Sequence, residues 1–300
     1  MTVALSLSAR HACAMTQTIA WLGTGLLGSG FVKAALKRGW AVRAWNRTPG
    51  KAKALEALGA KACTSIEEAV QGVERVHLCL SDDAAVDGAL EAMLAVKGFK
   101  GPVIDHTTTT PKGTAARAAK LAAKGIGFLA CPVFMGPANA AESAGRMLCA
   151  GPAALQEQLA PTLKSMTGEL VQLGEDVTKP ATLKLVGNSF IIGVCAVLTD
   201  ALAVAKGGGL EPKDVLPFIS NFPLGNIIAM RGQKVVSGDY SASFELTMAR
   251  KDVRLMKETA GAMPLAVLDG LGQRMDALIA AGHGTKDLGA LAVDLIPPAK

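Results

Sequence analysis

Short apolar runs alternate with amphipathic helical patterns along the first part of the chain. The runs that predict strands lie at residues 19–23, 41–46, 76–80, 103–105, 127–131, 147–150 and 170–173. Helical patterns fit between most of them, for example at 27–38 before Gly39 and at 111–124 before Gly125. Because strands that alternate with helices usually pair in parallel, residues 18–174 are predicted to form a largely parallel sheet with helices on both faces.

The pattern changes after Gly174. One helical pattern runs from 180 to 206 and ends at three consecutive glycines, and further helical stretches follow at 212–220, 226–237, 246–260 and 264–281, with no further strand evident. We therefore expect an α/β domain over residues 18–178 and an all-helical domain over 179–300, joined by a long interdomain helix. The boundary is placed between Gly174 and Pro180, and residues 1–17 are expected to be a disordered tail in which Met15 is an alternative initiator.

The long helix is apolar on several faces, so other helices or a second subunit must cover it, and a homodimer or homotetramer is expected. Half of the 300 residues are apolar, which argues against a disordered chain. No run of 18 or more uninterrupted apolar residues occurs, so no membrane span is expected. The formal charge of +6 is spread along the chain without basic blocks, which favours an anionic ligand and argues against nucleic acid.

The six cysteines are widely scattered. They form no Cys-x-x-Cys pair, and no histidine is placed to complete a zinc site. We therefore expect a reduced, cytoplasmic protein without a metal.

Three glycines follow the first predicted strand with the spacing G-x-G-x-x-G. Gly23 would permit the tight turn, Gly25 would let the backbone approach a pyrophosphate, and Gly28 would allow close packing of the next helix on the strand. The helix start would supply unpaired N–H groups to the anion. The predicted dinucleotide-binding residues here are the whole loop, Gly23, Thr24, Gly25, Leu26, Leu27 and Gly28; the alternative is a simple turn with a packing glycine.

After the second predicted strand the chain reads Trp45-Asn46-Arg47-Thr48, where an NAD-binding protein would carry a carboxylate. A carboxylate would repel a 2′-phosphate, whereas the Arg47 guanidinium would bind one, with Asn46 and Thr48 adding hydrogen bonds. The cofactor predicted is therefore NADP(H). The alternative is that Arg47 is a solvated turn residue and Thr48 caps the helix that begins at Pro49.

The loops after the third and fourth predicted strands should line the nicotinamide half of the cofactor, because ligands of open sheets bind beyond the carboxyl ends of the strands. Leu80, Ser81 and Asp82 occupy one of these loops, and Thr107 and Thr108 the other. The two threonines are candidates for hydrogen bonds to cofactor or substrate. A compatible alternative is that Asp82 and Thr110 cap the helices that follow them.

Four sequence blocks together resemble the β-hydroxyacid dehydrogenase family, which includes 3-hydroxyisobutyrate dehydrogenases and glyoxylate or succinic semialdehyde reductases. They are GTGLLG with the later NRT, DHTTTTP at 105–111, ACPVFMGP at 130–137, and KLVGN at 184–188 with the later ARKD. The resemblance covers residues 18–295. It implies a Rossmann-like domain, a helical domain built around the long helix, and an active site in the cleft between them.

The same resemblance implies a catalytic lysine at the start of a K-x-x-x-N motif, which Lys184 and Asn188 match. Residues four apart share one helical face, and this face continues through the apolar Ile191 and Cys195. Desolvation makes an ammonium easier to deprotonate, which suits a general acid that protonates a developing alkoxide while Asn188 holds the substrate. The alternative for Lys184 is an ordinary solvated lysine.

The resemblance also places Lys251 beside the nicotinamide end of the cofactor, with Asp252 orienting nearby groups. The alternative is that Lys251, Arg254 and Lys257 are the exposed side of an amphipathic helix.

Two blocks depart from the family pattern. Where family members usually read P-V-S-G-G, this chain has Phe134 and Met135 before Gly136, which removes a hydroxyl donor for a substrate carboxylate and narrows the space. Gly187 also stands before Asn188, where the family usually has a second asparagine. The predicted substrate-binding residues are Thr108, Phe134, Met135, Gly136, Lys184 and Asn188.

The function expected from these residues is an NADP(H)-dependent oxidoreductase that reduces a small aldehyde or keto acid, with Lys184 as the general acid. The alternatives are an imine reductase-like enzyme, or a sensor or scaffold that binds NADP(H) without much turnover.

Overall fold

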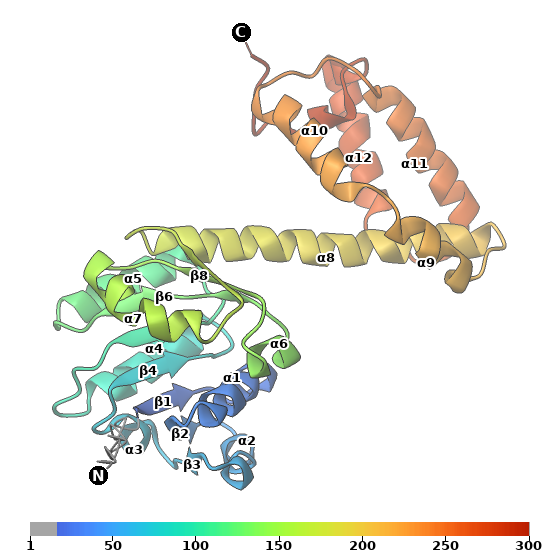
Figure 1. Cartoon of the computed structure of the whole chain (residues 1–300). Coiled ribbons are helices and arrows are strands. Elements are labelled where there is room, and N and C mark those ends of the chain that lie inside the picture. Colours follow the sequence, from blue (N-terminus) through green and yellow to red (C-terminus); the bar gives the residue numbers. More distant parts are fainter. Residues whose placement is uncertain (1–16, 300) are drawn as a thin grey trace, which may run out of the picture. The chain divides into compact units, whose positions relative to one another are not determined.

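The computed structural model describes residues 17–299, so the expectations for the tail up to residue 16, including Met15 and Cys13, lie outside the described residues. The chain divides into two compact units, one ending at Asn188 and the other beginning at Ser189 (Figure 1).

The first unit is built on a six-stranded parallel sheet with the strand order β3-β2-β1-β4-β5-β6. The strands are β1 (Thr18–Leu22), β2 (Ala41–Trp45), β3 (Lys61–Ala62), β4 (Arg75–Leu78), β5 (Val103–Asp105) and β6 (Phe128–Ala130). The central strand β1 pairs with β2 on one side and β4 on the other, so that Ala20 lies opposite both Arg43 and Val76. The predicted parallel α/β fold is confirmed.

Helices pack on both faces of this sheet. They are α1 (Leu26–Lys37), α2 (Pro49–Lys53), α3 (Ile66–Val70), α4 (Asp83–Leu94), α5 (Pro111–Ala122), α6 (Pro137–Ala141) and α7 (Ala153–Lys164), with a short turn η1 (Glu56–Leu58). Alternate residues of β1 point into two separate cores: Ile19 and Trp21 into one, Ala20 and Leu22 into the other. Burial on both faces explains why the strands read as continuous apolar runs.

A second sheet of three strands, β7 (Val133–Phe134), β8 (Arg146–Cys149) and β9 (Glu169–Gln172), completes the unit. We expected the segments of β8 and β9 to continue the main sheet, and this was wrong. The chain leaves β6 at Pro132, which has no N–H to donate to a ladder, and turns into β7, which pairs antiparallel with β8. An isolated bridge between Ala130 and Ala150 connects the two sheets.

The long helix α8 (Thr178–Gly207) follows, and the second unit is helical over its described residues, 189–299. Its other elements are α9 (Pro212–Ser220), α10 (Leu224–Val236), α11 (Leu246–Ala260) and α12 (Leu268–Leu278), with the turns η2 (Ile279–His283) and η3 (Leu288–Ala292). Leu246, Val253 and Met275 belong to its core. The Asp200 carboxylate of α8 accepts hydrogen bonds from the N–H groups of Ala266, Val267 and Leu268, which fixes the start of α12.

Candidate active site

The loop between β1 and α1 can be formed only by glycine at two of its positions. Gly23 has φ +100°, and a Cβ there would lie 2.1 Å from the Cys79 carbonyl oxygen. A Cβ on Gly28 would lie 2.0 Å from the Gly23 carbonyl oxygen. Because neither residue has a Cβ, the loop packs closely against the residue after β4, and α1 packs closely on the turn. This is the role that the glycine spacing predicted.

Gly25 lies at the N-terminus of α1, where a Cβ would meet no atom within 4 Å. No side chain caps this helix, so its first-turn N–H groups can donate to an anion. The Thr24 hydroxyl is buried and has no hydrogen-bond partner among the described residues. Leu26 is exposed and Leu27 is half-buried. Open space, free donors and an orphaned hydroxyl fit the pyrophosphate of a dinucleotide.

Asn46, at the end of β2, joins two loops. Its Oδ1 accepts a hydrogen bond from Thr24 N–H at 3.0 Å, and its Nδ2 donates to the Thr48 carbonyl oxygen at 3.0 Å. The side chain therefore holds the glycine loop against the next loop, in addition to any contact with a ligand. Arg47 is exposed and makes no hydrogen bond or ion pair with any residue between 17 and 299. Thr48 precedes α2, but its side chain makes no capping bond.

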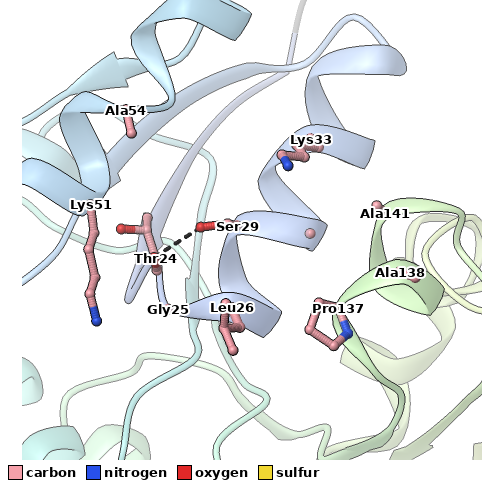
Figure 2. A pocket seen from close by; sticks show the side chains of 11 residues that line it. Thr24, Gly25, Leu26, Ser29, Lys33, Lys51, Ala54, Pro137, Ala138 and Ala141 are labelled. Atoms are coloured by element: carbon pink, nitrogen blue, oxygen red, sulfur yellow. Dashed lines mark hydrogen bonds between the residues drawn. The ribbon is translucent and has the colours of Figure 1, made fainter.

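A pocket of about 470 Å³ borders the glycine loop and is lined by residues of α1, α2 and α6 (Figure 2). Two of its lining residues, Lys33 and Lys51, are cationic, and none is acidic. The Ser29 hydroxyl donates to the Thr24 carbonyl oxygen at 2.9 Å, which links the first turn of α1 to the glycine loop at the border of the pocket. Sequence reasoning missed both lysines, because neither belongs to the glycine motif or to the Asn46–Thr48 segment.

The loops after β4 and β5 are tied together by Thr107, whose hydroxyl accepts a hydrogen bond from Leu80 N–H at 3.0 Å. The side chains of Ser81 and Asp82 are used locally: Ser81 donates to Asp82, and Asp82 caps α4 by accepting from Ala85 N–H at 2.8 Å. That bond is the main reason that the pKa of Asp82 is lowered.

Thr110 likewise caps α5, accepting from Gly113 N–H at 3.1 Å, so the predicted caps at Asp82 and Thr110 are both confirmed. Thr108 is half-buried beside them.

A continuous chain of buried hydrogen bonds runs beneath these loops, and sequence reasoning did not foresee it. Arg75 Nε donates to His77 Nε2 at 3.0 Å, so His77 carries its proton on Nδ1, which lies 3.0 Å from His106 Nε2. His106 Nδ1 in turn lies 2.9 Å from the Cys131 carbonyl oxygen. Burial lowers the pKa of both imidazoles, that of His106 to about 4. The neighbouring Asp105 is buried too, which raises its pKa to about 6.

Lys184 lies on the face of α8 that meets β7. Its Nζ donates to Asn188 Oδ1 at 2.9 Å and lies 4.3 Å from the centre of the Phe134 ring. Lys184 and Asn188 are half-buried, whereas Leu185 and Val186 on the other side of the helix are exposed. Burial lowers the pKa of Lys184. The Lys184 ammonium is therefore fixed by the Asn188 side chain and the Phe134 ring and is not fully exposed to solvent.

The segment before α6 is packed differently at each residue. The Phe134 ring covers Gly187, where a Cβ would lie 2.3 Å from the ring. Met135 packs against the core of the first unit and beside Gly145. The Gly136 N–H donates to Asn139 Oδ1 at 3.0 Å. The structure thus brings Phe134 together with Lys184 and turns much of Met135 inward.

Lys251 belongs to α11 of the second unit. Its Nζ pairs with Asp252 Oδ1 at 2.9 Å, and both side chains are partly exposed. This arrangement fits either sequence interpretation of Lys251.

Comparisons with known proteins define the class. A family model for the NAD binding domain of 6-phosphogluconate dehydrogenase matches residues 18–174. A second, described as NAD-binding of NADP-dependent 3-hydroxyisobutyrate dehydrogenase, matches residues 179–294. Together with the glycine loop they define an NAD(P)-dependent oxidoreductase. The chain belongs to the β-hydroxyacid dehydrogenase family, in agreement with the resemblance found from its motifs.

Individual relatives match most of the chain. The uncharacterized oxidoreductase YfjR of Bacillus subtilis is 28% identical over 91% of this chain and 98% of its own. Glyoxylate/succinic semialdehyde reductase 2 of Arabidopsis thaliana is 29% identical over 80% of this chain and 68% of its own. Among solved structures, an imine reductase from Pseudomonas sp. superposes with a TM-score of 0.84 over 93% of this chain and 99% of its own, at 21% identity, which shows the shared fold.

Proposed function

We propose that this protein is an NADP(H)-dependent reductase of a small aldehyde or keto acid. The observation that carries the proposal is the Lys184–Asn188 pair, a half-buried ammonium hydrogen-bonded at 2.9 Å to an amide oxygen on the same helical face. The family includes reductases of this substrate class, as the name of the Arabidopsis relative states.

The bound dinucleotide supplies the hydride for the carbonyl carbon. Lys184 gives a proton to the oxygen as negative charge develops on it, and the resulting amine regains a proton from solvent. Burial lowers the pKa of this lysine and so brings proton donation closer to neutral pH. The Asn188 carboxamide holds Nζ in position, and its Nδ2 remains a donor for the substrate oxygen.

Preference for NADP(H) over NAD(H) is supported by the charges around the adenosine half of the expected site. Arg47 is exposed and unpaired within residues 17–299, and Lys51 lines the pocket that borders the glycine loop. The loop after β2 carries no carboxylate that would repel a 2′-phosphate.

The test is NADPH oxidation, followed by absorbance, with succinic semialdehyde, glyoxylate and methylglyoxal. We expect turnover of at least one of them and a fall in kcat of about a hundredfold or more for Lys184→Met, in line with the loss of general acid catalysis. The matched control is Lys179→Met, an exposed lysine near the start of the same helix, which should leave kcat unchanged. Wild-type kcat in the Lys184→Met variant would refute the proposed role.

Imine reduction is the second candidate, because the apolar Phe134 ring, rather than a hydroxyl donor, lies 4.3 Å from Lys184 Nζ. A cyclic imine in the same assay distinguishes the two activities. Tight NADPH binding without turnover of any compound would instead favour the sensor or scaffold.

We also propose that a second copy of the chain covers α8. Phe190, Ile191 and Ile192 on this helix are more than half exposed, as are Phe218 and Met230 on α9 and α10.

By length and composition alone, α8 is also apolar enough to cross a membrane, although no uninterrupted apolar run of 18 residues occurs in it. The Asp200 carboxylate within the helix, bonded to three N–H groups of α12, favours a protein interface. Light scattering should give a dimer or tetramer without detergent; a monomer would contradict this.

A further inference from the structure

The aromatic ring of Phe134 packs directly against the backbone of Gly187, in the space that a side chain at position 187 would occupy. An added Cβ on Gly187 would approach ring carbons of Phe134 to 2.3 and 2.4 Å, closer than real Cβ contacts occur. Gly187 lies inside α8, where glycine weakens a helix relative to alanine. The contact with Phe134 gives a physical reason for a glycine at this position.

The same ring also contacts the proposed general acid. Lys184 Nζ lies 4.3 Å from the ring centroid, within the range of a cation–π interaction, while its hydrogen bond to Asn188 fixes it from the other direction. Phe134 thus sits beside the ammonium that is proposed to protonate the substrate oxygen. A group attached to the reacting carbon would come close to this aromatic surface.

Three positions around Phe134 offer no free donor to a carboxylate. Residue 134 has no hydroxyl, the Gly136 N–H is already bonded to Asn139 Oδ1 at 3.0 Å, and Pro137 has no N–H. A carboxylate packed against the ring itself would lose hydration there without gaining a hydrogen bond from residue 134, 136 or 137. An alkyl or aryl group would instead gain contact with the ring.

We propose that the Phe134–Gly187 contact sets substrate specificity, selecting aldehydes or ketones that carry an apolar substituent on the carbonyl carbon over those that carry a carboxylate there, and that Phe134 positions Lys184. This inference rests on the proposed carbonyl reduction and narrows it. The reaction is the transfer of a hydride from NADPH to the carbonyl carbon and of a proton from Lys184 to the oxygen, which yields an alcohol and NADP⁺.

The specificity test compares isobutyraldehyde with glyoxylate, because the two aldehydes differ mainly in an isopropyl group against a carboxylate of similar shape. We expect wild-type kcat/KM to favour isobutyraldehyde at least tenfold, and Phe134→Ser to shift the ratio at least tenfold toward glyoxylate. Comparing the ratio between the two enzymes cancels the hydration of each aldehyde in water. A wild-type preference for glyoxylate, or an unchanged ratio in Phe134→Ser, overturns the specificity assignment while leaving carbonyl reduction intact. Turnover of neither aldehyde by either enzyme overturns the specificity assignment, and carbonyl reduction is overturned as well if succinic semialdehyde and methylglyoxal are not reduced either.

The contact itself is tested without activity by a double-mutant cycle on melting temperature. Gly187→Ala should lower the melting temperature by about 5 °C when Phe134 is present, because the new methyl overpacks the ring. In the Phe134→Ser background the same change should be neutral or raise it by about 2 °C through helix propensity. Gly88→Ala in α4, where a Cβ meets no atom within 4 Å, is the control and should behave alike in both backgrounds. Equal effects of Gly187→Ala in both backgrounds overturn the contact.

The positioning role of Phe134 is tested by the pH dependence of kcat/KM for isobutyraldehyde. The ring stabilises the Lys184 ammonium, so Phe134→Leu should lower the pKa of Lys184 and move the alkaline limb of the profile to lower pH by about 0.5 unit. Phe134→Tyr keeps an aromatic face and should keep the limb in place. An alkaline limb of the kcat/KM profile that lies at the same pH in Phe134→Leu as in the wild type overturns the positioning role.

Discussion

Acidification should destabilise the first unit through its buried imidazoles. Above pH about 6.5 both His77 and His106 are neutral whether the chain is folded or not. Below that pH the unfolded chain binds protons at both, while burial keeps the folded imidazoles neutral, that of His106 down to about pH 4. The unfolded state then binds more protons, so the free energy of unfolding falls as the pH falls.

The size of the effect follows from His106. A pH of 5 lies about 1.5 units below the pKa of an ordinary imidazole, so the unfolded chain binds a proton there that the folded chain does not. This lowers the free energy of unfolding by about 2 kcal/mol relative to pH 7.5. His77 adds to the loss in the same direction. Asp105 opposes it, because burial raises its pKa to about 6 and the folded state binds a proton there first. Its contribution, present at low pH and lost as the pH rises through 6, is about 1 kcal/mol at pH 5.

The assay is urea unfolding at pH 7.5 and pH 5, followed by tryptophan fluorescence. All three tryptophans, at positions 21, 40 and 45, lie in the first unit, and the Trp21 ring stacks on His77 with 4.8 Å between centroids. Wild-type protein should be less stable at pH 5. Asp105→Asn retains an acceptor for Thr107 N–H but removes the opposing titration, so its loss should be larger by about 1 kcal/mol. A loss of stability between pH 7.5 and pH 5 that is equal or smaller in Asp105→Asn than in the wild type would refute the reasoning.

Three further changes test other parts of the structure. Gly28→Ala should abolish NADPH binding, measured by fluorescence titration, because its Cβ would overlap the Gly23 carbonyl oxygen; unchanged affinity would contradict the loop geometry. Arg47→Ser should raise the KM for NADPH about tenfold or more, with little change for NADH, since only the 2′-phosphate needs the guanidinium; a parallel rise for both would remove Arg47 from that role. Asp200→Ala should destabilise the second unit by about 3 kcal/mol, seen as loss of helical circular dichroism at lower urea, because three N–H groups at the start of α12 lose their acceptor.

Element positions could be predicted where the pattern was long or sharply bounded. The expected ranges 103–105, 212–220 and 246–260 coincide with β5, α9 and α11. The strands β3 and β7 were missed because each has only two residues, too few to show a period, and each forms by pairing with a neighbouring strand.

The candidate site was predictable in part. The spacing of Lys184 and Asn188 placed them on one helical face, and the structure joins them by a hydrogen bond. No spacing could indicate that Phe134 would face Lys184 or that Met135 would pack inward, because these contacts depend on how β7 meets α8.

The sequence by itself determined the alternation of strands and helices, the glycine loop and the lack of a carboxylate after β2, because these depend on periodicity and on the local backbone. Only the tertiary structure decided which polar groups remain free for a ligand. Asn46 is bonded to Thr24, and Asp82 and Gly136 are bonded within their own turns, whereas the N-terminus of α1 keeps its donors. The reason is that a hydrogen-bond partner or a packing neighbour is fixed by proximity in space, often to a distant segment, and one-dimensional patterns do not carry that information.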